Sequence, residues 1–96
     1  MMSKTNYRTQ ILNEAADIIN GDRQDEYGPP LENWSCIAAQ WSATSGHTFT
    51  PVDVGLHMIQ VKIGRVATGN KMSIDTFRDI IGYAAITAEI ISNDLP

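Results

Sequence analysis

Apolar residues recur along this chain at intervals of three and four, the spacing that places them on one face of an α-helix. The pattern predicts four helices, at about residues 5–20, 31–45, 51–68 and 74–92. No segment shows the sustained apolar–polar alternation of a half-buried strand. The chain is therefore predicted to be all-α and to form one four-helix unit.

Local signals place several helix ends. Thr50 and Pro51 suit the N-cap and the first position of the third helix, and Asp53 supplies an acid in its first turn. Gly21 and Gly46 follow the last apolar positions of the first and second helices. We expect Gly21 to end its helix in the left-handed conformation, which glycine adopts without strain.

A loop is predicted between the first two helices, over residues 21–30. Its sequence, GDRQDEYGPP, holds two glycines and paired prolines, which do not continue a helix. Arg23, Glu26 and Tyr27 bring a guanidinium, a carboxylate and an aromatic ring close together, and Gly28 before the prolines indicates an unusual backbone path. The loop either binds a nucleotide, with arginine on phosphate and tyrosine on a base, or is a structured connection.

The same periodicity predicts the core. On the second helix one apolar stripe is formed by Trp34, Ile37, Ala38 and Trp41. The side chains expected to face inward on the last two helices are Leu56, Ile59, Ile63, Val66, Phe77, Ile80, Ile81, Ala84, Ala88 and Ile91. Gly55 and Gly64 each cost a helix about 1 kcal/mol relative to alanine, so we expect another element to pack closely on both. Cys36 is expected to be a small buried side chain.

Length and composition limit the class of protein. The 96 residues make a single domain, 1–96, with residues 1–4 and 93–96 expected to be frayed. A chain of this length buries only about 60–65% of its unfolded surface, so its core is thin and a homo-oligomer is expected. No apolar stretch reaches the roughly 18–20 residues of a membrane span, and no signal peptide is evident, so a cytoplasmic protein without membrane contact is expected.

The charge excludes one class of partner. Eleven acidic and seven basic residues give a net charge of −4, and no segment is rich in lysine or arginine. Binding of a DNA or RNA polymer is therefore not expected, because nothing neutralises a run of phosphates. A small anionic ligand needs only a few convergent cations.

Charged residues on the last two helices are the first candidates for chemistry. Lys62 and Arg65 share a face of the third helix, and Asp75, Asp79 and Tyr83 share a face of the fourth. Because a short turn joins these helices, they should pack antiparallel and bring Lys62 or Arg65 near Asp79 or Tyr83. The group is either a structural ion-pair network or a polar pocket that takes phosphates, a metal ion or a ribose.

Two further candidates lie elsewhere. Glu14 and Asp17 are three residues apart on the first helix, so both carboxylates share a face and could hold Mg²⁺ or be simply solvated. His57 follows Asp53 by four residues and could pair with it at the helix surface or act as a general base. A solvated histidine is the commoner case.

A family resemblance emerges from three segments, GDRQDEYG, TPVDVGLHMIQVKIGRVATG and DTFRDIIGYAAI. Together they resemble small phage-encoded proteins of uncharacterised function over about residues 10–92. That group in turn looks like a distant branch of the all-α, MazG-like nucleotide pyrophosphohydrolases. The resemblance implies an oligomeric four-helix protein that uses Mg²⁺ and E-x-x-E and E-x-x-D motifs to hydrolyse nucleoside triphosphates.

Carried onto this chain, the acidic motifs fall on Glu14 with Asp17 and on Asp75 with Asp79, the second pair spaced by four instead of three. The doubled-glutamate E-E-x-x-E run is absent. A Mg²⁺ site for phosphoryl attack needs several clustered carboxylates. The leading hypothesis is therefore a protein that is not an enzyme, with no catalytic residue and no cofactor.

Under this hypothesis the chain sequesters a nucleotide signal of host immunity, such as a cyclic ADP-ribose isomer or a cyclic oligonucleotide, as a phage anti-defence sponge. The ligand-binding residues would be Arg23, Tyr27, Lys62, Arg65, Asp79 and Tyr83. The alternative is a Mg²⁺-dependent pyrophosphohydrolase that uses the four acids as metal ligands. A third hypothesis is a helical module whose tryptophan or methionine faces dock a host protein.

Overall fold

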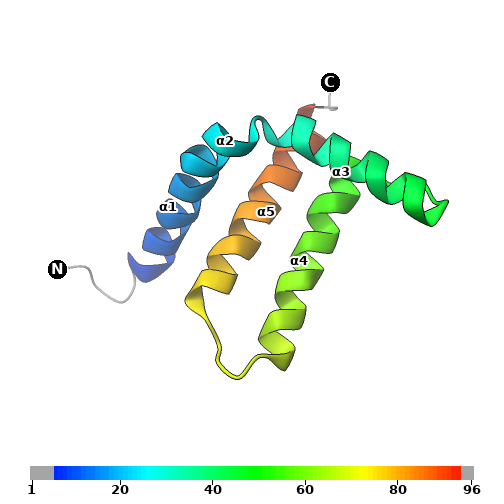
Figure 1. Cartoon of the computed structure of the whole chain (residues 1–96). Helices are drawn as coiled ribbons and strands as arrows, with labels where there is room; N and C mark the ends of the chain where they lie inside the picture. Colours follow the sequence, from blue (N-terminus) through cyan, green and yellow to red (C-terminus); the bar gives the residue numbers. More distant parts are fainter. Residues whose placement is uncertain (1–5, 94–96) are drawn as a thin grey trace.

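A computed structural model describes the backbone of residues 6–93, and the side chains of these residues except 22–24. Over this range the chain is all-helical, as predicted, and has no strand. The helices are α1 (Tyr7–Asn20), α2 (Asp22–Tyr27), α3 (Pro30–Ser45), α4 (Pro51–Thr68) and α5 (Ile74–Asn93) (Figure 1). The fraying predicted for residues 1–4 and 94–96 lies outside the described residues, whereas Asn93 is helical.

The loop predicted over residues 21–30 contains a short helix, α2, so that prediction was wrong for residues 22–27. The segment DRQDEY can be helical because the glycines and prolines of the predicted loop lie before and after it, not within it. The Asp25 amide donates a hydrogen bond to the Gly21 carbonyl at 3.2 Å. Gly21 is not left-handed, since its φ and ψ are −105° and −126°. Gly28, with φ +78°, has the unusual backbone path that was predicted.

The predicted start of α4 and end of α3 are confirmed. The Thr50 hydroxyl accepts from the Asp53 amide, and the Asp53 carboxylate accepts from the Thr50 amide at 2.8 Å, which forms a reciprocal capping box. Gly46 is left-handed, with φ +77°, and its amide donates to the Ser42 carbonyl. The Ser42 hydroxyl also accepts from the Phe49 amide at 2.8 Å, so the loop is tied to the helix that precedes it.

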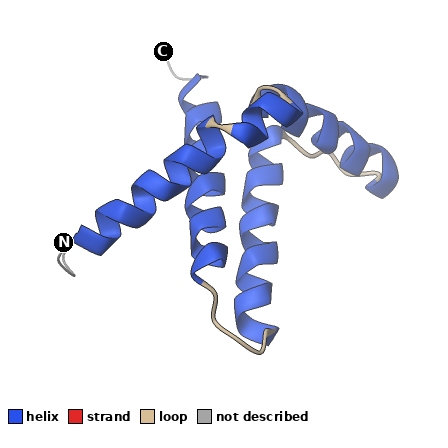
Figure 2. Cartoon of the chain, turned by 60° about the vertical axis from the view of Figure 1, so that its left-hand side comes forward, coloured by secondary structure: helices blue, strands red, loops and turns tan. Residues whose placement is uncertain are grey.

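The helices form an open arrangement in which α5 lies between α1 and α4, and α3 crosses α4 from one side (Figures 1 and 2). The core is small. Its buried residues are Trp34 and Ala38 of α3, Val54 of α4 and Ile90 of α5. Trp34 and Ala38 belong to the apolar stripe predicted for the second helix, and Ile37 and Trp41 pack against this core.

Close packing at Gly55 is confirmed. A Cβ atom there would lie 1.9 Å from the Thr87 hydroxyl oxygen and 2.8 Å from a ring carbon of Trp34, so α5 and α3 approach α4 closely at this point. Gly82 of α5 allows a similar approach by α1, since its Cβ would lie 2.9 Å from Ile19. The prediction was wrong for Gly64, where a Cβ would meet no described atom within 4 Å.

Several residues predicted to face inward are exposed. Leu56 is 49% exposed, Ile63 54%, Phe77 38% and Ile91 45%, and Ala84 and Ala88 are exposed as well. Cys36, predicted to be buried, is also exposed. The helix residues are exposed because α4 and α5 each carry apolar residues on two faces, and the other described helices cover only one of these faces. No described helix is long and apolar enough to cross a membrane.

Candidate functional site

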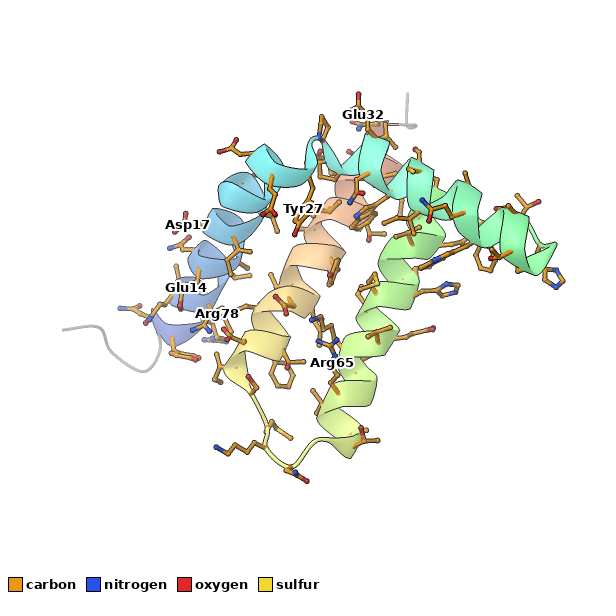
Figure 3. The ribbon with its side chains drawn as sticks, viewed as in Figure 1. Glu14, Asp17, Tyr27, Glu32, Arg65 and Arg78 are labelled. Carbon is orange, nitrogen blue, oxygen red and sulfur yellow. The ribbon has the colours of Figure 1, made fainter. Side chains whose placement is uncertain are left out.

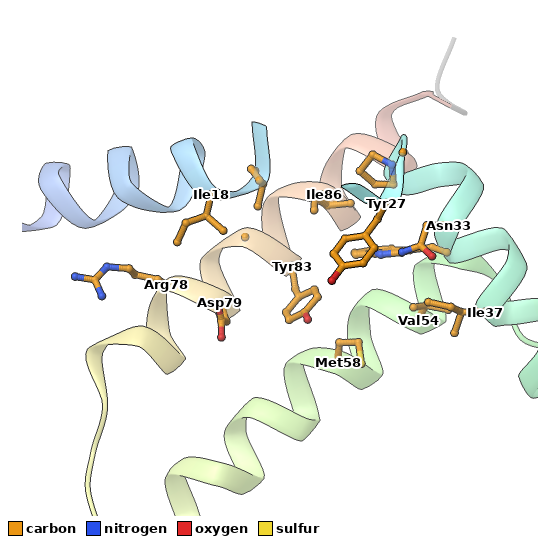
Figure 4. Close-up of a pocket in the computed structure, with 15 residues that line it drawn as sticks. Ile18, Tyr27, Asn33, Ile37, Val54, Met58, Arg78, Asp79, Tyr83 and Ile86 are labelled. Carbon is orange, nitrogen blue, oxygen red and sulfur yellow. The ribbon is translucent and has the colours of Figure 1, made fainter. Parts of the chain in front are cut away.

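The helices line a pocket of about 470 Å³, here called the central pocket (Figure 4). Its volume lies within the range of about 300–1,000 Å³ typical of small-molecule sites. Every helix contributes to its walls. The lining residues are Ile18, Ile19, Tyr27, Gly28, Pro30, Asn33, Trp34, Ile37, Val54, Met58, Arg78, Asp79, Gly82, Tyr83 and Ile86.

Aromatic rings form one part of the central pocket. Trp34 and Tyr83 are in contact, with ring centroids 6.1 Å apart and ring planes tilted by 38°. Tyr27 lies at the end of α2 and is 61% exposed, and its ring extends into the pocket region near Tyr83 (Figure 4). The left-handed Gly28 ends α2 at this point and so sets the position of Tyr27. Such a set of rings can hold a flat aromatic group by stacking.

An ion pair lies at the edge of the pocket. Lys62 Nζ of α4 is 2.9 Å from Asp79 Oδ2 of α5, and their side chains are only 12% and 17% exposed. This is one of the pairings predicted across the antiparallel helices, in which Lys62 or Arg65 was expected near Asp79 or Tyr83. Arg65, one turn further along α4, has an exposed side chain beside the α4–α5 boundary (Figure 3). The two cations that were predicted together thus have different environments.

Arg78 is a site residue that the sequence analysis missed. Its guanidinium lies 2.9 Å from Glu14 Oε2 on α1 and also hydrogen-bonds to Asp75 Oδ1 one turn away on α5. The hydrogen bond to Asp75 raises the pKa of Arg78, desolvation lowers it, and the Glu14 charge raises it again, with a rise as the net result. The i, i+3 spacing of Asp75 and Arg78 was a visible signal, whereas the contact with Glu14 required the packing of α1 on α5.

These contacts determine how the four predicted metal ligands are arranged. Glu14 and Asp75 both bind Arg78, and Asp79 binds Lys62. Asp17 is exposed on α1 (Figure 3). Across the described residues, no three acidic, histidine or cysteine side chains are placed together to hold a metal ion. The four acids therefore make cation pairs or face solvent, and do not form one cluster.

The other predicted site residues either lie apart from the central pocket or have side chains that the structure does not describe. The backbone of Arg23 belongs to α2, but its side chain lies outside the described residues. His57 stacks on Trp41 with ring centroids 5.6 Å apart and meets the edge of Phe49 at 5.5 Å. The Asp53 carboxylate takes part in the capping box of α4. His57 belongs to an aromatic cluster between α3 and α4.

The comparisons with known proteins give a family and two phage relatives. Residues 10–91 match a family described as a domain of unknown function (DUF6378). The chain is 46% identical over 77 residues to the Gene 55 protein of Mycobacterium phage L5, which covers 79% of this chain and 49% of that protein. It is 39% identical over 80 residues to the Gene 55 protein of Mycobacterium phage D29, covering 83% and 52%. The chain thus spans about half the length of these relatives, and no solved structure matches it.

Proposed function

We propose that this chain, which belongs to the DUF6378 family, binds a small nucleotide-derived molecule in the central pocket and retains it without hydrolysis. One observation carries the proposal: the pocket joins aromatic rings to an ion pair, Lys62 with Asp79, that is largely shielded from solvent. A nucleotide presents the complementary groups, namely a flat base, ribose hydroxyls and phosphates.

The roles follow from the side-chain chemistry. Tyr27 and Tyr83 stack on the base, because aromatic faces pack on flat rings. Asp79 accepts hydrogen bonds from ribose hydroxyls, since a carboxylate has only acceptors. Lys62 and the exposed Arg65 meet the phosphates, which favour charge-assisted hydrogen bonds. Arg23 of α2 is the third cation in this proposal.

Binding without hydrolysis is favoured by the pairing of the acids. Mg²⁺ chemistry on a triphosphate needs carboxylates clustered on the metal. In this chain Arg78 joins Glu14 to Asp75, and Lys62 holds Asp79, so a metal would have to displace a cation from each. A Mg²⁺-dependent pyrophosphohydrolase remains the second candidate function, with Glu14, Asp17, Asp75 and Asp79 rearranged as ligands.

The phage origin of the relatives supports a biological role for such binding. A small protein that retains an immune second messenger, such as a cyclic ADP-ribose isomer or a cyclic oligonucleotide, would act as an anti-defence sponge in the host cytoplasm. A helical module that docks a host protein is the third candidate, and it needs no pocket ligand.

One experiment separates these functions. Freshly purified protein is incubated with a nucleotide panel and Mg²⁺, washed, denatured by heat and analysed by mass spectrometry. Intact nucleotide released in stoichiometric amount supports sequestration, and monophosphate with turnover supports the hydrolase. A panel in which nothing is retained and no melting temperature changes would contradict both and leave the docking module.

Tyr27 provides the matched test of the site. Tyr27→Ala should weaken retention about 5- to 150-fold, since loss of one stacking contact costs about 1–3 kcal/mol. Tyr7→Ala is the control, because Tyr7 is likewise exposed, at 42%, but does not line the pocket. Equal retention by both variants would place the ligand elsewhere.

A further inference from the structure

The side of the α4–α5 hairpin that faces away from the central pocket is apolar along both helices. On α4 the residues at spacings of four, three and four are Val52, Leu56, Ile59 and Ile63, of which Val52 also packs against the core. On α5 the residues at alternating spacings of three and four are Ile74, Phe77, Ile81, Ala84, Ala88 and Ile91. We call these ten residues the outer face. None of them is charged, and the spacing is that of helices packed side by side.

Helix geometry places the outer face opposite the pocket. On α4, Val54 and Met58 line the pocket, while Gly55 and Lys62 meet α5. Leu56 follows Val54 by two residues, which is about 200° around the helix. On α5 the same rotation separates Ala84 from the pocket residue Gly82. Both stripes therefore lie on one side of the hairpin, away from the pocket.

Much of the outer face is uncovered in the protomer. Leu56, Ile63, Ile74 and Ile91 are each 45–54% exposed, and Phe77 is 38% exposed. The helix α3 crosses from the other side of α4 (Figures 1 and 2). The Cα radius of gyration of 15.1 Å also exceeds the value of about 12.5 Å for a compact domain of this length. The protomer is thus an open layer with one covered side.

We propose that the outer face is the interface between two copies of this chain. Helices of 18 and 20 residues are about 27 and 30 Å long, and neighbouring axes lie about 9 Å apart. The outer face runs over 12 residues of α4 and 18 of α5, about 18 and 27 Å, and is about 20 Å across. Its flat area of roughly 450 Å² is of the same order as the roughly 800 Å² of accessible surface that each partner buries in a stable interface.

A second copy is the partner that this chemistry fits. The outer face has no charged side chain that could pair with a charged partner. A two-fold axis, in contrast, brings the equally apolar outer face of a second copy against it. Ala84 and Ala88 leave a shallow strip on α5 between the larger Phe77 and Ile91. Isoleucine and leucine side chains of the partner's α4 fill that strip, and two hairpins then complete a four-helix bundle.

The test is the mass of the full chain in solution, measured by light scattering over a dilution series. We expect twice the 10.6 kDa of one chain for the wild type. Ile63→Lys places a charge on the outer face and should weaken association about 100-fold, giving monomer at concentrations where the wild type is dimeric. Val61→Lys is the matched control, because Val61 lies on the same helix with a similar exposure of 45% but outside the face, and it should remain a dimer.

Circular dichroism shows whether each variant is helical, and Ile91→Lys repeats the test from α5 if Ile63→Lys does not fold. A monomeric wild type, or equal dimerisation of the outer-face and Val61 variants, would overturn the proposal. Because the pocket lies on the other side of the hairpin, a monomeric Ile63→Lys protein should still retain the pocket ligand. Failure of the dimer is thus distinguishable from failure of nucleotide binding.

Discussion

Gly55 and Gly64 lie on the same helix in opposite environments. The space for a Cβ at Gly55 is filled by Thr87 and Trp34, and that at Gly64 is open. The sequence treats both alike, because a helix with an internal glycine loses the same propensity at either position. Only the neighbours of each residue separate a glycine needed for packing from one that only weakens the helix.

Alanine substitutions test this difference. Gly55→Ala should lower the free energy of unfolding by about 1–3 kcal/mol, because the core must shift to admit the methyl group. Gly64→Ala should raise it by about 0.5–1 kcal/mol through improved helix propensity. Urea denaturation of both variants measures the two changes. A stabilised Gly55→Ala protein would contradict the close approach of α5 and α3.

At the scale of elements, ion pairs join helices that are distant in sequence. Lys62 with Asp79 connects α4 to α5, and Arg78 with Glu14 connects α5 to α1. The first was predictable, because a short turn forces α4 and α5 to be antiparallel neighbours. The second was not, since the position of α1 depends on how the α2 segment turns the chain. Arg78, the residue missed in the sequence, is the one that depends on that turn.

The Lys62 pair has a stability role that Arg65 lacks. Lys62→Met should lower the free energy of unfolding by about 1–3 kcal/mol, because it leaves the shielded Asp79 without this cation. Arg65→Met should change it by less than about 0.5 kcal/mol, since its side chain is exposed. Under the proposed function both variants lose nucleotide retention. Two variants that bind normally, with only Lys62→Met less stable, would identify the pair as purely structural.

At the scale of the whole molecule, the fold has two different sides. The central pocket lies on the side covered by α3, and the outer face lies on the other side of the α4–α5 hairpin. The homo-oligomer expected from the thin core therefore has a definite arrangement under the proposal. In the proposed dimer the second copy completes the hydrophobic core, and each protomer carries its own pocket.

Thermal unfolding provides a test of that arrangement. For a protein that unfolds from a dimer, the melting temperature rises with protein concentration by mass action. We expect such a rise for the wild type over a 100-fold range of about 1–100 µM, and a smaller one or none for Ile63→Lys. Differential scanning fluorimetry measures both. A concentration-independent wild-type melting temperature would indicate a folded monomer.

The sequence by itself determined the four long helices, because their periodicity, the Thr50 N-cap, the end of α3 at Gly46 and the unusual backbone path at Gly28 are local features. It also indicated that Lys62 or Arg65 approaches Asp79 or Tyr83, which follows from one short turn, and the structure identifies the pair as Lys62 with Asp79. It did not determine α2 or the conformation of Gly21. Tertiary structure alone decided which apolar stripe is covered, because periodicity identifies apolar faces but not their partners. It likewise placed Arg78 between Glu14 and Asp75 and gathered the aromatic rings into one pocket, since these contacts join segments whose relative positions no local pattern specifies.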